Sequence, residues 1–421
     1  MADLSHVCSL ILTPADVALF REPRPFDAGS AALSQLPSPQ TAAGALRTWL
    51  LTQFGADLSG MRAARSHTAN GMTVAERQKQ TLLAAIPETH PARWVLGAEL
   101  AGPLLCHRGT GSPLMPIPLH IVRRMGDPQY LHRLGPLATL DVMPGRRILP
   151  NSGTPPDPHP RLRPCWPPTP GEMERPEQGF VKADTLQAHM LHSAKRPEVG
   201  HITPSSEIYQ FEPRLGIGMD SNRNTTREGQ IYSVSFLRLR DSRRDNSKAH
   251  ENNKAPVAYS FRVDIRTDED RKPVIRAALS RQPFLRFGGE GKVAGIELCE
   301  DAAHLPKPGK WPPALGRFST YLATPGLFAG NSWYPRGLSD YCDLIGAIVD
   351  APMTYSGWDS LRNQPLPTRA AVSSGAIYFW EIRDDPPADP PADPHGANIS
   401  DDENDRQAGW GLCLRGEWEY V

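Results

Sequence analysis

The chain has 421 residues, 39% of them hydrophobic and nine of them Trp, which is enough for two domains with substantial cores. Its 46 Lys and Arg balance 46 Asp and Glu, which excludes the strong overall positive charge typical of many nucleic-acid-binding proteins. The apolar stretch at residues 7–12 is too short for a membrane span or a signal-peptide core, so we expect a cytoplasmic protein without membrane contact.

The charge is unevenly distributed along the chain. Residues 381–405 contain nine acidic residues and one arginine, so the remaining chain has 45 Lys and Arg against 37 Asp and Glu. Such a mild excess suits a subunit that grips a short piece of RNA. For any single arginine, ordinary solvated surface is the alternative interpretation.

The N-terminal segment predicts a strand followed by a stiff basic loop. Residues 6–13 are apolar at both alternating sets of positions, as in a central strand. In residues 21–26 two prolines fix φ and push the residues before them toward extended backbone. We therefore expect Arg21 and Arg24 to project from a pre-ordered loop.

A helix is predicted next. Ser38 can accept the first free N–H groups of a helix, and Pro39 sits where a missing N–H costs nothing. Apolar residues then recur at three- and four-residue spacing over 42–54, and Gly55 is a natural stop. Arg47 lies on a neighbouring face, where a solvated or salt-bridged role competes with a ligand role.

The rest of the first half predicts short strands and one more helix. Apolar runs separated by Gly and Pro indicate strands at 94–100, 114–122 and 147–149, and loosely helical spacing indicates a helix at 179–192. The proline-dense stretch 151–176 predicts a long surface loop.

The second half is predicted to be rich in strands, with two inserts. Residues 240–255 are polar enough to lack order alone, with a projecting hairpin formed by the strands on either side. Residues 384–408, which are acidic and proline-rich, predict a disordered insert in a C-terminal hairpin. The predicted strands are 214–219, 230–239, 257–265, 284–287, 293–300, 345–349 and 376–382.

This order of elements indicates an α+β fold with helices packed on one face of an antiparallel sheet. We place an N-terminal domain at 1–204 and a C-terminal domain at 205–421.

Two candidate sites are read from local sequence. The turn Gly288-Gly289-Glu290-Gly291 lacks the Lys-Ser/Thr of a phosphate-transfer loop, but its main chain can approach RNA phosphates closely; a plain tight turn is the alternative. Trp358 offers a surface for base stacking, against the alternative of a core residue.

Metal and redox sites are not indicated. The six cysteines contain no Cys-x-x-Cys pair, and His189 and His192 have no acidic or thiol ligand at recognisable spacing. Five histidines in the first half of the chain are candidates for general acid or base catalysis only because of their residue type. None of them lies in a motif with a paired base. These are His6, His67, His107, His120 and His132.

The basic loop and the Pro-Ser-Pro-x-Thr-x-x-Gly-x-x-Arg helix resemble the N-terminal signature of the RAMP superfamily of CRISPR proteins. Within this superfamily, the chain most closely resembles the third subunit of the Cmr (type III-B) effector complex. That family belongs to the Cas-five-like group. Further motifs follow in that family's order at 215–220, 229–232, 286–291, 321–326, 357–359 and 374–379. Residues 409–416 resemble the glycine-rich loop of RAMP proteins.

The resemblance implies two tandem ferredoxin-like (RRM-like) RAMP domains with long loop insertions. It also implies a non-catalytic, cofactor-free subunit that binds the 5′ handle of the guide crRNA, docks the large palm-domain subunit and abuts a backbone RAMP subunit. The RNA-binding residues would be Arg21, Arg24 and Arg47 for charge, and Gly288, Gly289, Gly291, Gly409 and Gly411 for backbone contact. The alternative is a metal-independent RAMP endoribonuclease that processes precursor crRNA with a histidine.

Overall fold

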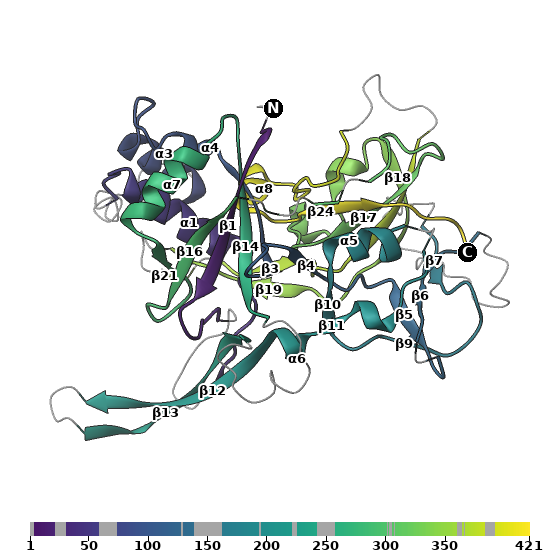
Figure 1. Cartoon of the computed structure of the whole chain (residues 1–421), viewed down its shortest axis with the longest axis horizontal. Coiled ribbons are helices and arrows are strands. Elements are labelled where there is room, and N and C mark those ends of the chain that lie inside the picture. The colour runs from purple at the N-terminus through teal and green to yellow at the C-terminus, as the bar shows by residue number, and fades with distance from the viewer. Residues whose placement is uncertain are drawn as a thin grey trace.

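A computed structural model shows the chain folded around two antiparallel sheets (Figure 1). It describes residues 4–21, 31–58, 74–127, 129–138, 162–192, 195–220, 225–241, 257–300, 302, 305–306, 308–359, 364–365, 367–383 and 392–421.

The first sheet is built around four strands with two crossover helices. In spatial order the strands are β3 (Glu99–His107), β14 (Tyr259–Thr267), β1 (His6–Pro14) and β16 (Val293–Cys299). Helix α1 (Pro39–Gln53) connects β1 toward β3, and α7 (Lys272–Arg281) connects β14 to β16. When these four strands are numbered by their order in the chain, their order across the sheet is 2-3-1-4. This is the strand order of a β-α-β-β-α-β unit.

Helix α1 forms where its sequence predicts. The Ser38 hydroxyl accepts the Thr41 N–H at 3.2 Å, and Pro39 occupies the first helical turn. The apolar stripe buries Leu46, Trp49 and Leu50, each worth about 1.5–3 kcal/mol.

A long insertion, residues 108–258, separates β3 from β14. It widens the first sheet with β4 (Pro113–Pro116), β10 (Gly179–Lys182) and β11 (Thr203–Pro204), while β15 (Phe284–Arg286) covers the opposite edge. It also carries the hairpin of β12 (Tyr209–Asp220) and β13 (Thr225–Leu239), which projects from the body in Figure 1. Strand β2 (Ala31–Ala32) pairs in parallel with β13.

The second sheet repeats the strand order of the first. Its strands are β18 (Cys342–Ile348), β23 (Ile377–Ile382), β17 (Arg317–Leu322) and β24 (Cys413–Gly416). The short helical turns η5 (Ala329–Asn331) and η6 (Arg336–Leu338) connect β17 to β18, and α8 (Glu403–Ala408) precedes β24. Trp380, Tyr378 and Phe318 are fully buried in its core.

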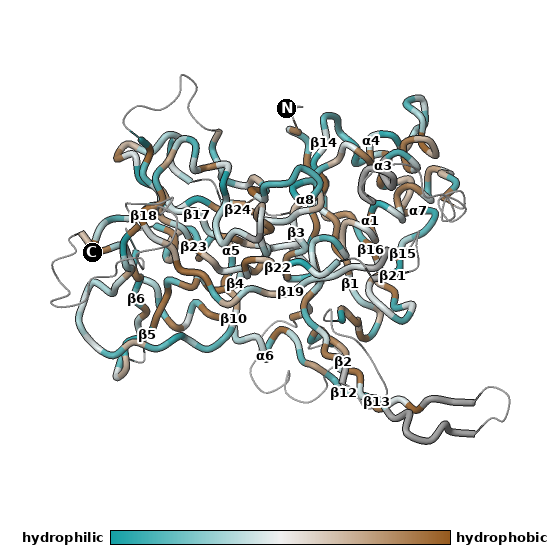
Figure 2. The backbone as a smooth tube through the Cα atoms, turned by 180° about the vertical axis from the view of Figure 1, so that it is seen from behind, coloured by the Kyte–Doolittle hydropathy of each residue, from teal (hydrophilic) through white to brown (hydrophobic). Residues whose placement is uncertain are grey.

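Smaller elements surround the two sheets. The helices are α3 (Val74–Ala85), α4 (Trp94–Gly97), α5 (Ala183–Thr185), η3 (Leu186–Met190), η4 (Val199–His201) and α6 (Ser205–Ile208). The strands are β5 (Ile121–Arg124), β6 (Leu131–Arg133), β7 (Gly135–Pro136), β8 (Cys165–Trp166), β9 (Met173–Glu174), β19 (Met353–Tyr355), β20 (Trp358–Asp359), β21 (Gln364–Pro365) and β22 (Arg369–Ala371). Figure 2 shows hydrophobic residues concentrated in the interior strands and hydrophilic residues in many of the peripheral loops.

The α+β prediction is confirmed, but the sheets do not divide the chain at 204/205. Strands β14, β15 and β16 lie after that boundary and pair within the sheet that begins with β1. The second sheet starts only at Arg317. The sequence hides this division because pairing between strands about 250 residues apart leaves no local pattern.

Several local predictions also differ from the structure. Residues 94–97 form α4 instead of the predicted strand start, and two-residue strands β8 and β9 lie within 151–176. The projecting hairpin is β12–β13, because β14 pairs with β1 and β3. The loop residues 242–256 and the predicted strand 147–149 lie outside the described residues.

The prediction of disorder across 384–408 is wrong from residue 392 onward. Helix α8 occupies 403–408, and the Asp402 carboxylate caps it by accepting the N–H groups of Asn404 and Asp405. The acidic cluster is therefore partly a helix N-terminus, where negative charge is favourable. Residues 384–391 lie outside the described part of the chain.

Within the described ranges, no helix is long and apolar enough to cross a membrane.

Stability should depend strongly on one buried ion pair in β14. Arg262 Nε and Asp264 Oδ1 lie 2.7 Å apart with side chains only 3% and 8% exposed, and Arg262 Nη1 also donates to the Gly111 carbonyl. We expect Asp264→Ala to lower the free energy of unfolding by about 3–5 kcal/mol, because it takes the carboxylate partner away from a buried guanidinium. Urea unfolding measures this change.

The matched control is Arg108→Ala, which breaks an exposed pair with Glu297. It should cost no more than about 1 kcal/mol. Equal effects of the two variants would show that burial of the β14 pair does not control its contribution.

Candidate nucleic-acid interface

Arg21 and the 288–291 turn are brought together by the segment that follows β1. The Gly289 N–H donates to the Leu19 carbonyl at 2.8 Å, two residues before Arg21. Phe20, between Leu19 and Arg21 in the chain, is buried, and its ring centroid lies 4.9 Å from that of Phe287. Exposed Arg21 therefore lies beside the glycine turn.

The turn needs glycine for backbone reasons. Gly288 has φ +97°, and a Cβ there would lie 2.7 Å from the Leu19 carbonyl oxygen. Gly291 has φ +67° with open space around it. The turn thus fits tightly against residue 19 on one side and is open at Gly291. The approach of an RNA phosphate to its main chain stays a prediction.

The base of the β12–β13 hairpin adds further cations. Phe236 lies between the Lys292 Nζ, 4.8 Å from its ring centroid, and the Arg214 Cζ, 5.2 Å from it. Lys292 directly follows the glycine turn. We call this group the hairpin-base surface; its cations are Arg21, Arg214, Arg238 and Lys292.

Carboxylates hold the hairpin arginines in place. Glu212 bonds Arg214 and Arg238, each at 2.7 Å, and Asp16 bonds Arg238 at 2.8 Å. Hydrogen bonds from Arg214 and then Arg238 hold the pKa of Glu212 below its usual value. The arginines are thereby pre-oriented, while their net positive charge is reduced.

Arg47 and the C-terminal glycine loop form a second, separate grouping that faces inward. Arg47 Nη2 donates to the carbonyls of Gln407, at 2.9 Å, and Ala98, at 3.3 Å. Burial lowers the pKa of Arg47. This arginine ties α1 to β3 and α8 and is not a solvated surface residue.

Gly409 and Gly411 are buried and used in packing. Gly409 ends α8 with φ +98°, and a Cβ there would lie 2.6 Å from the Gly102 carbonyl oxygen. The N–H groups of Gly409 and Gly411 donate to Arg406 and Pro325. In this structure the close main-chain approach at these two glycines is to the protein itself.

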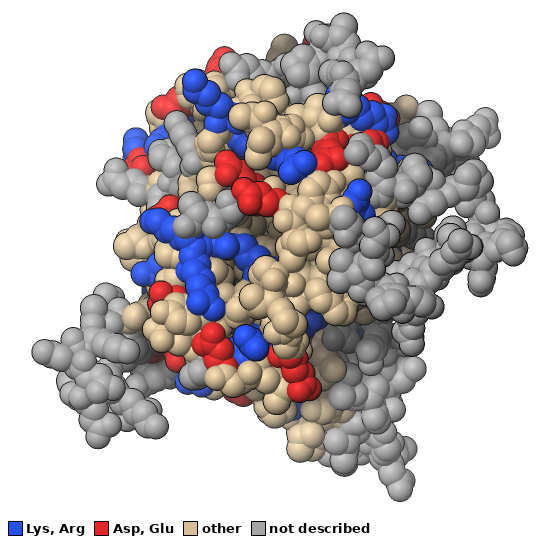
Figure 3. Space-filling model, turned by 90° about the vertical axis from the view of Figure 1, so that its right-hand side faces the viewer, with Lys and Arg blue, Asp and Glu red and all other residues tan. Residues whose placement is uncertain are grey.

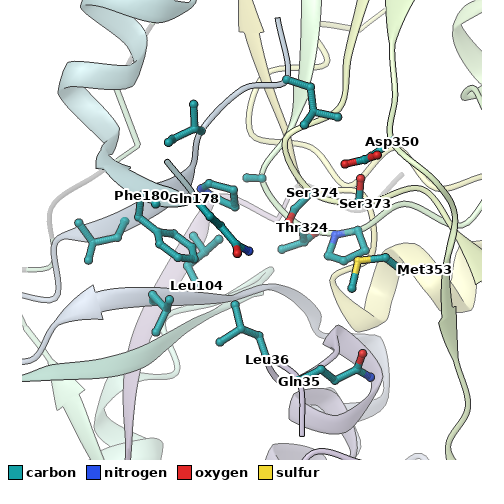
Figure 4. A pocket seen from close by; sticks show the side chains of 18 of the residues that line it. Gln35, Leu36, Leu104, Gln178, Phe180, Thr324, Asp350, Met353, Ser373 and Ser374 are labelled. Atoms are coloured by element: carbon teal, nitrogen blue, oxygen red, sulfur yellow. The ribbon is translucent and has the colours of Figure 1, made fainter. Parts of the chain in front are cut away.

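A cavity of about 830 Å³ lies at the junction of the two sheets. Figure 4 shows side chains pointing into it from the segment before α1, from β3 and β10, and from loops of the second sheet. Leu104, Phe180 and Met353 give it apolar walls. Its polar lining includes Gln35, Gln178, Thr324, Asp350, Ser373 and Ser374. Hydrogen-bonding side chains on apolar walls, among them the Asp350 carboxylate, suit a planar group that carries hydrogen-bond donors.

The histidines proposed for catalysis are dispersed. His120 is buried, lies 3.1 Å from the Met190 carbonyl oxygen, and has its pKa lowered by burial to about 3. His107 packs beside Tyr259, and His6 is exposed on β1. His67 lies outside the described residues, and His132 lies on β6 with its Nε2 3.5 Å from Arg196 Nη2.

All six cysteines are free thiols, and burial raises the pKa of Cys106 to about 12. His192 pairs with Glu417 at 3.3 Å. No group of three or more His, Cys, Asp or Glu suited to a metal is found among the residues that the structure describes.

The structure therefore separates the predicted site residues into two groups. Arg21 lies with Gly288, Gly289 and Gly291; Arg47 lies with Gly409 and Gly411. Arg24 and the side chain of Trp358 are outside the described part. Lys292, Arg214 and Arg238 were not among the predicted RNA-binding residues, although Lys292 directly follows the glycine motif and Arg238 opens an arginine-rich stretch.

A family comparison defines the class of protein: residues 10–418 match the model of a family described as CRISPR-associated protein (Cas_Cmr3). The chain belongs to the Cas_Cmr3 family. This confirms the identification drawn from the sequence motifs.

Solved structures of low similarity also match. A chain of the type III-B Cmr-beta complex bound to cognate target RNA and AMPPnP, state 1, has 16% identity and a TM-score of 0.42. A chain of the same type of complex bound to cognate target RNA has 17% identity and a TM-score of 0.40. Each comparison covers 88% of this chain and 86% of the other. No curated protein sequence matches.

The two glycine groups should respond differently to alanine. Gly291→Ala should lower the free energy of unfolding by about 1–2 kcal/mol, because only the left-handed backbone opposes a side chain there. Gly409→Ala should cost at least about 1 kcal/mol more, because its Cβ also meets the Gly102 carbonyl. Equal urea-unfolding midpoints would contradict the tight contact between Gly409 and β3.

Proposed function

We propose that this protein is a non-catalytic subunit of a type III-B CRISPR RNA-guided effector complex and that it binds the 5′ handle of the crRNA. The observation that carries the proposal is the hairpin-base surface, where Arg21 and Lys292 flank an open glycine turn. Family membership supports the setting. In this proposal the two sheets, which share one strand order, are tandem ferredoxin-like units.

The chemistry of this surface suits RNA. Arginine and lysine neutralise phosphates, and a bare glycine main chain lets a phosphate approach closely. The ion pairs of Arg214 and Arg238 with Glu212 fix their geometry before binding. The cavity beside the segment that precedes α1 would take an unstacked base against its apolar wall.

Docking to the large palm-domain subunit and to a backbone RAMP subunit is the second part of the proposal. The outward face of β12 supports it, because Phe211, Leu215 and Ile217 are 45%, 79% and 51% exposed along one side of the projecting hairpin. Contiguous exposed apolar side chains of this kind mark interaction surfaces.

Handle binding is tested with Arg21→Ala/Lys292→Ala. We expect about tenfold weaker binding of a handle-containing RNA and a salt slope flatter by up to about 1.4, because two phosphate contacts are lost. Fluorescence anisotropy at several salt concentrations measures both quantities. The control Arg276→Ala/Arg383→Ala removes two exposed arginines that lie on α7 and just after β23.

Equal losses in the two double variants would refute a specific site at the hairpin base. The same RNA, incubated with wild-type protein in EDTA, should stay intact. Site-specific cleavage abolished by one histidine substitution would replace the binding proposal with the endoribonuclease.

Docking is tested with Leu215→Glu. We expect at least fivefold less co-purification with the palm-domain subunit, because a charge is placed in an apolar contact, and unchanged affinity for handle RNA. Co-purification equal to that of the wild type would exclude the β12 face as the docking surface.

A further inference from the structure

A second group of cations lies on β5 and β6 and on the loop before η4, within the insertion that follows β3. Figure 3 looks onto the side of the molecule that carries β5, β6 and β9 and shows Lys and Arg side chains gathered there. None of these residues belongs to the hairpin-base surface. We call the group the β6 cluster; it consists of Arg124, His132, Arg133, His189, Lys195, Arg196 and His201.

Arg133 positions the cluster. Its Nη2 donates to the carbonyls of His189 and Lys195 and so fixes the loop after η3 against β6. The His189 Nδ1 lies 3.2 Å from the Arg196 carbonyl oxygen, and the rings of His189 and His201 lie 4.3 Å apart. The cations are therefore held together by main-chain contacts.

Arg196 forms a stack that remains open on one side. Its Cζ lies 4.1 Å from the centroid of the Tyr130 ring, and its side chain is 51% exposed. A guanidinium covered on one face by an aromatic ring presents its other face and its edge N–H groups to a ligand. Nucleic-acid bases stack on such guanidinium planes, whereas carboxylates of an acidic peptide use only the edge.

Positive charge is in excess here. Asp127 lies 3.6 Å from Arg196, Glu198 accepts the His201 N–H, and Glu174 pairs with Arg123. In the described part of the molecule, no carboxylate forms an ion pair with Arg124, Arg133 or Lys195. Tyr130 also faces the cluster, through the contact of its ring with Arg196.

We propose that the β6 cluster is a second RNA-binding site, which holds the phosphodiester backbone of a single strand with one base stacked on Arg196. The site is independent of the hairpin-base surface, because it lies on other elements and shares no residue with it. It is a binding site and not a nuclease centre: the imidazoles of His189 and His201 are packed together and cannot flank a phosphate from opposite sides.

Histidine protonation should couple to binding. Burial, then Arg196, lowers the pKa of His132, and burial, then His189, lowers the pKa of His201. A bound phosphate opposes the effect of the positive neighbours and raises both pKa values, so binding takes up protons. Affinity should therefore rise as the pH falls from 7.5 to 6.0 and be lost as it rises again.

The neutral tautomers of the two stacked histidines differ. The His189 Nδ1 faces a carbonyl oxygen and carries the hydrogen. His201 accepts the Glu198 N–H at Nδ1, so its Nε2 already donates when neutral. His201 can therefore donate to a phosphate in its neutral form.

The test uses the purified full chain and a fluorescent 12-nucleotide oligouridylate that lacks any handle sequence. Lys195→Ala/Arg196→Ala should bind at least about fivefold more weakly, with a salt slope flatter by about 0.7–1.4. Arg276→Ala/Arg383→Ala, with the same change in charge, should bind like the wild type. Arg21→Ala/Lys292→Ala measures the hairpin-base surface with the same probe.

The pH arm uses His132→Gln and His201→Gln. Wild-type affinity should rise about three- to tenfold from pH 7.5 to 6.0, and each variant should show a smaller rise. Equal binding by Lys195→Ala/Arg196→Ala and the control would overturn the proposal. So would loss of binding to a polyglutamate peptide without loss of RNA binding, which would assign the cluster to an acidic protein segment.

Discussion

A polar seam joins the two sheets where the segment 98–102 at the start of β3 meets residues 398–411, beside a buried apolar cluster to which both sheets contribute. Asn398 Nδ2 donates to the carbonyls of Leu100 and Arg406, each at 2.7 Å, and to Glu99. Arg47 adds bonds to both sides of the seam, and Gly409 permits the approach to Gly102. Because these groups are buried, losing one partner leaves another unsatisfied, and the seam fixes the cavity whose walls come from both sheets.

This seam explains why the strongest sequence motifs do not all lie on the surface. The Arg47 helix motif and the C-terminal glycine loop resemble RNA-contacting elements, yet here they meet each other across the junction. Their effect on an RNA ligand would then be indirect, through the relative position of the two sheets. The exposed cations lie instead at Arg21, beside the 288–291 turn and at the base of the hairpin.

Local chemistry in the sequence predicted local structure well. The cap at Ser38, the proline after it and the apolar stripe fixed α1 within a residue at each end, and the two-sided apolar pattern of residues 6–13 correctly placed β1 in the middle of a sheet. Long-range pairing was not readable, since β14 and β16 carry no mark of their partnership with β1. Asp402, which caps α8, lies within a run of acidic residues, and this run was interpreted as a disordered acidic segment.

The zero net charge of the chain hides two cationic surfaces of different design. At the hairpin base, Asp16 and Glu212 neutralise part of the charge of Arg214 and Arg238. These ion pairs therefore contribute to binding by fixing the geometry of the arginines more than by electrostatic attraction of a ligand. In the β6 cluster the cations outnumber the carboxylates, and main-chain carbonyls hold the loop in place. The net positive charge is therefore larger than at the hairpin base. It makes protonation of His132 unfavourable in the free protein. Screening by salt acts on both, but only the second should respond to pH near neutrality. A subunit with both would hold one stretch of RNA by shape and another by charge.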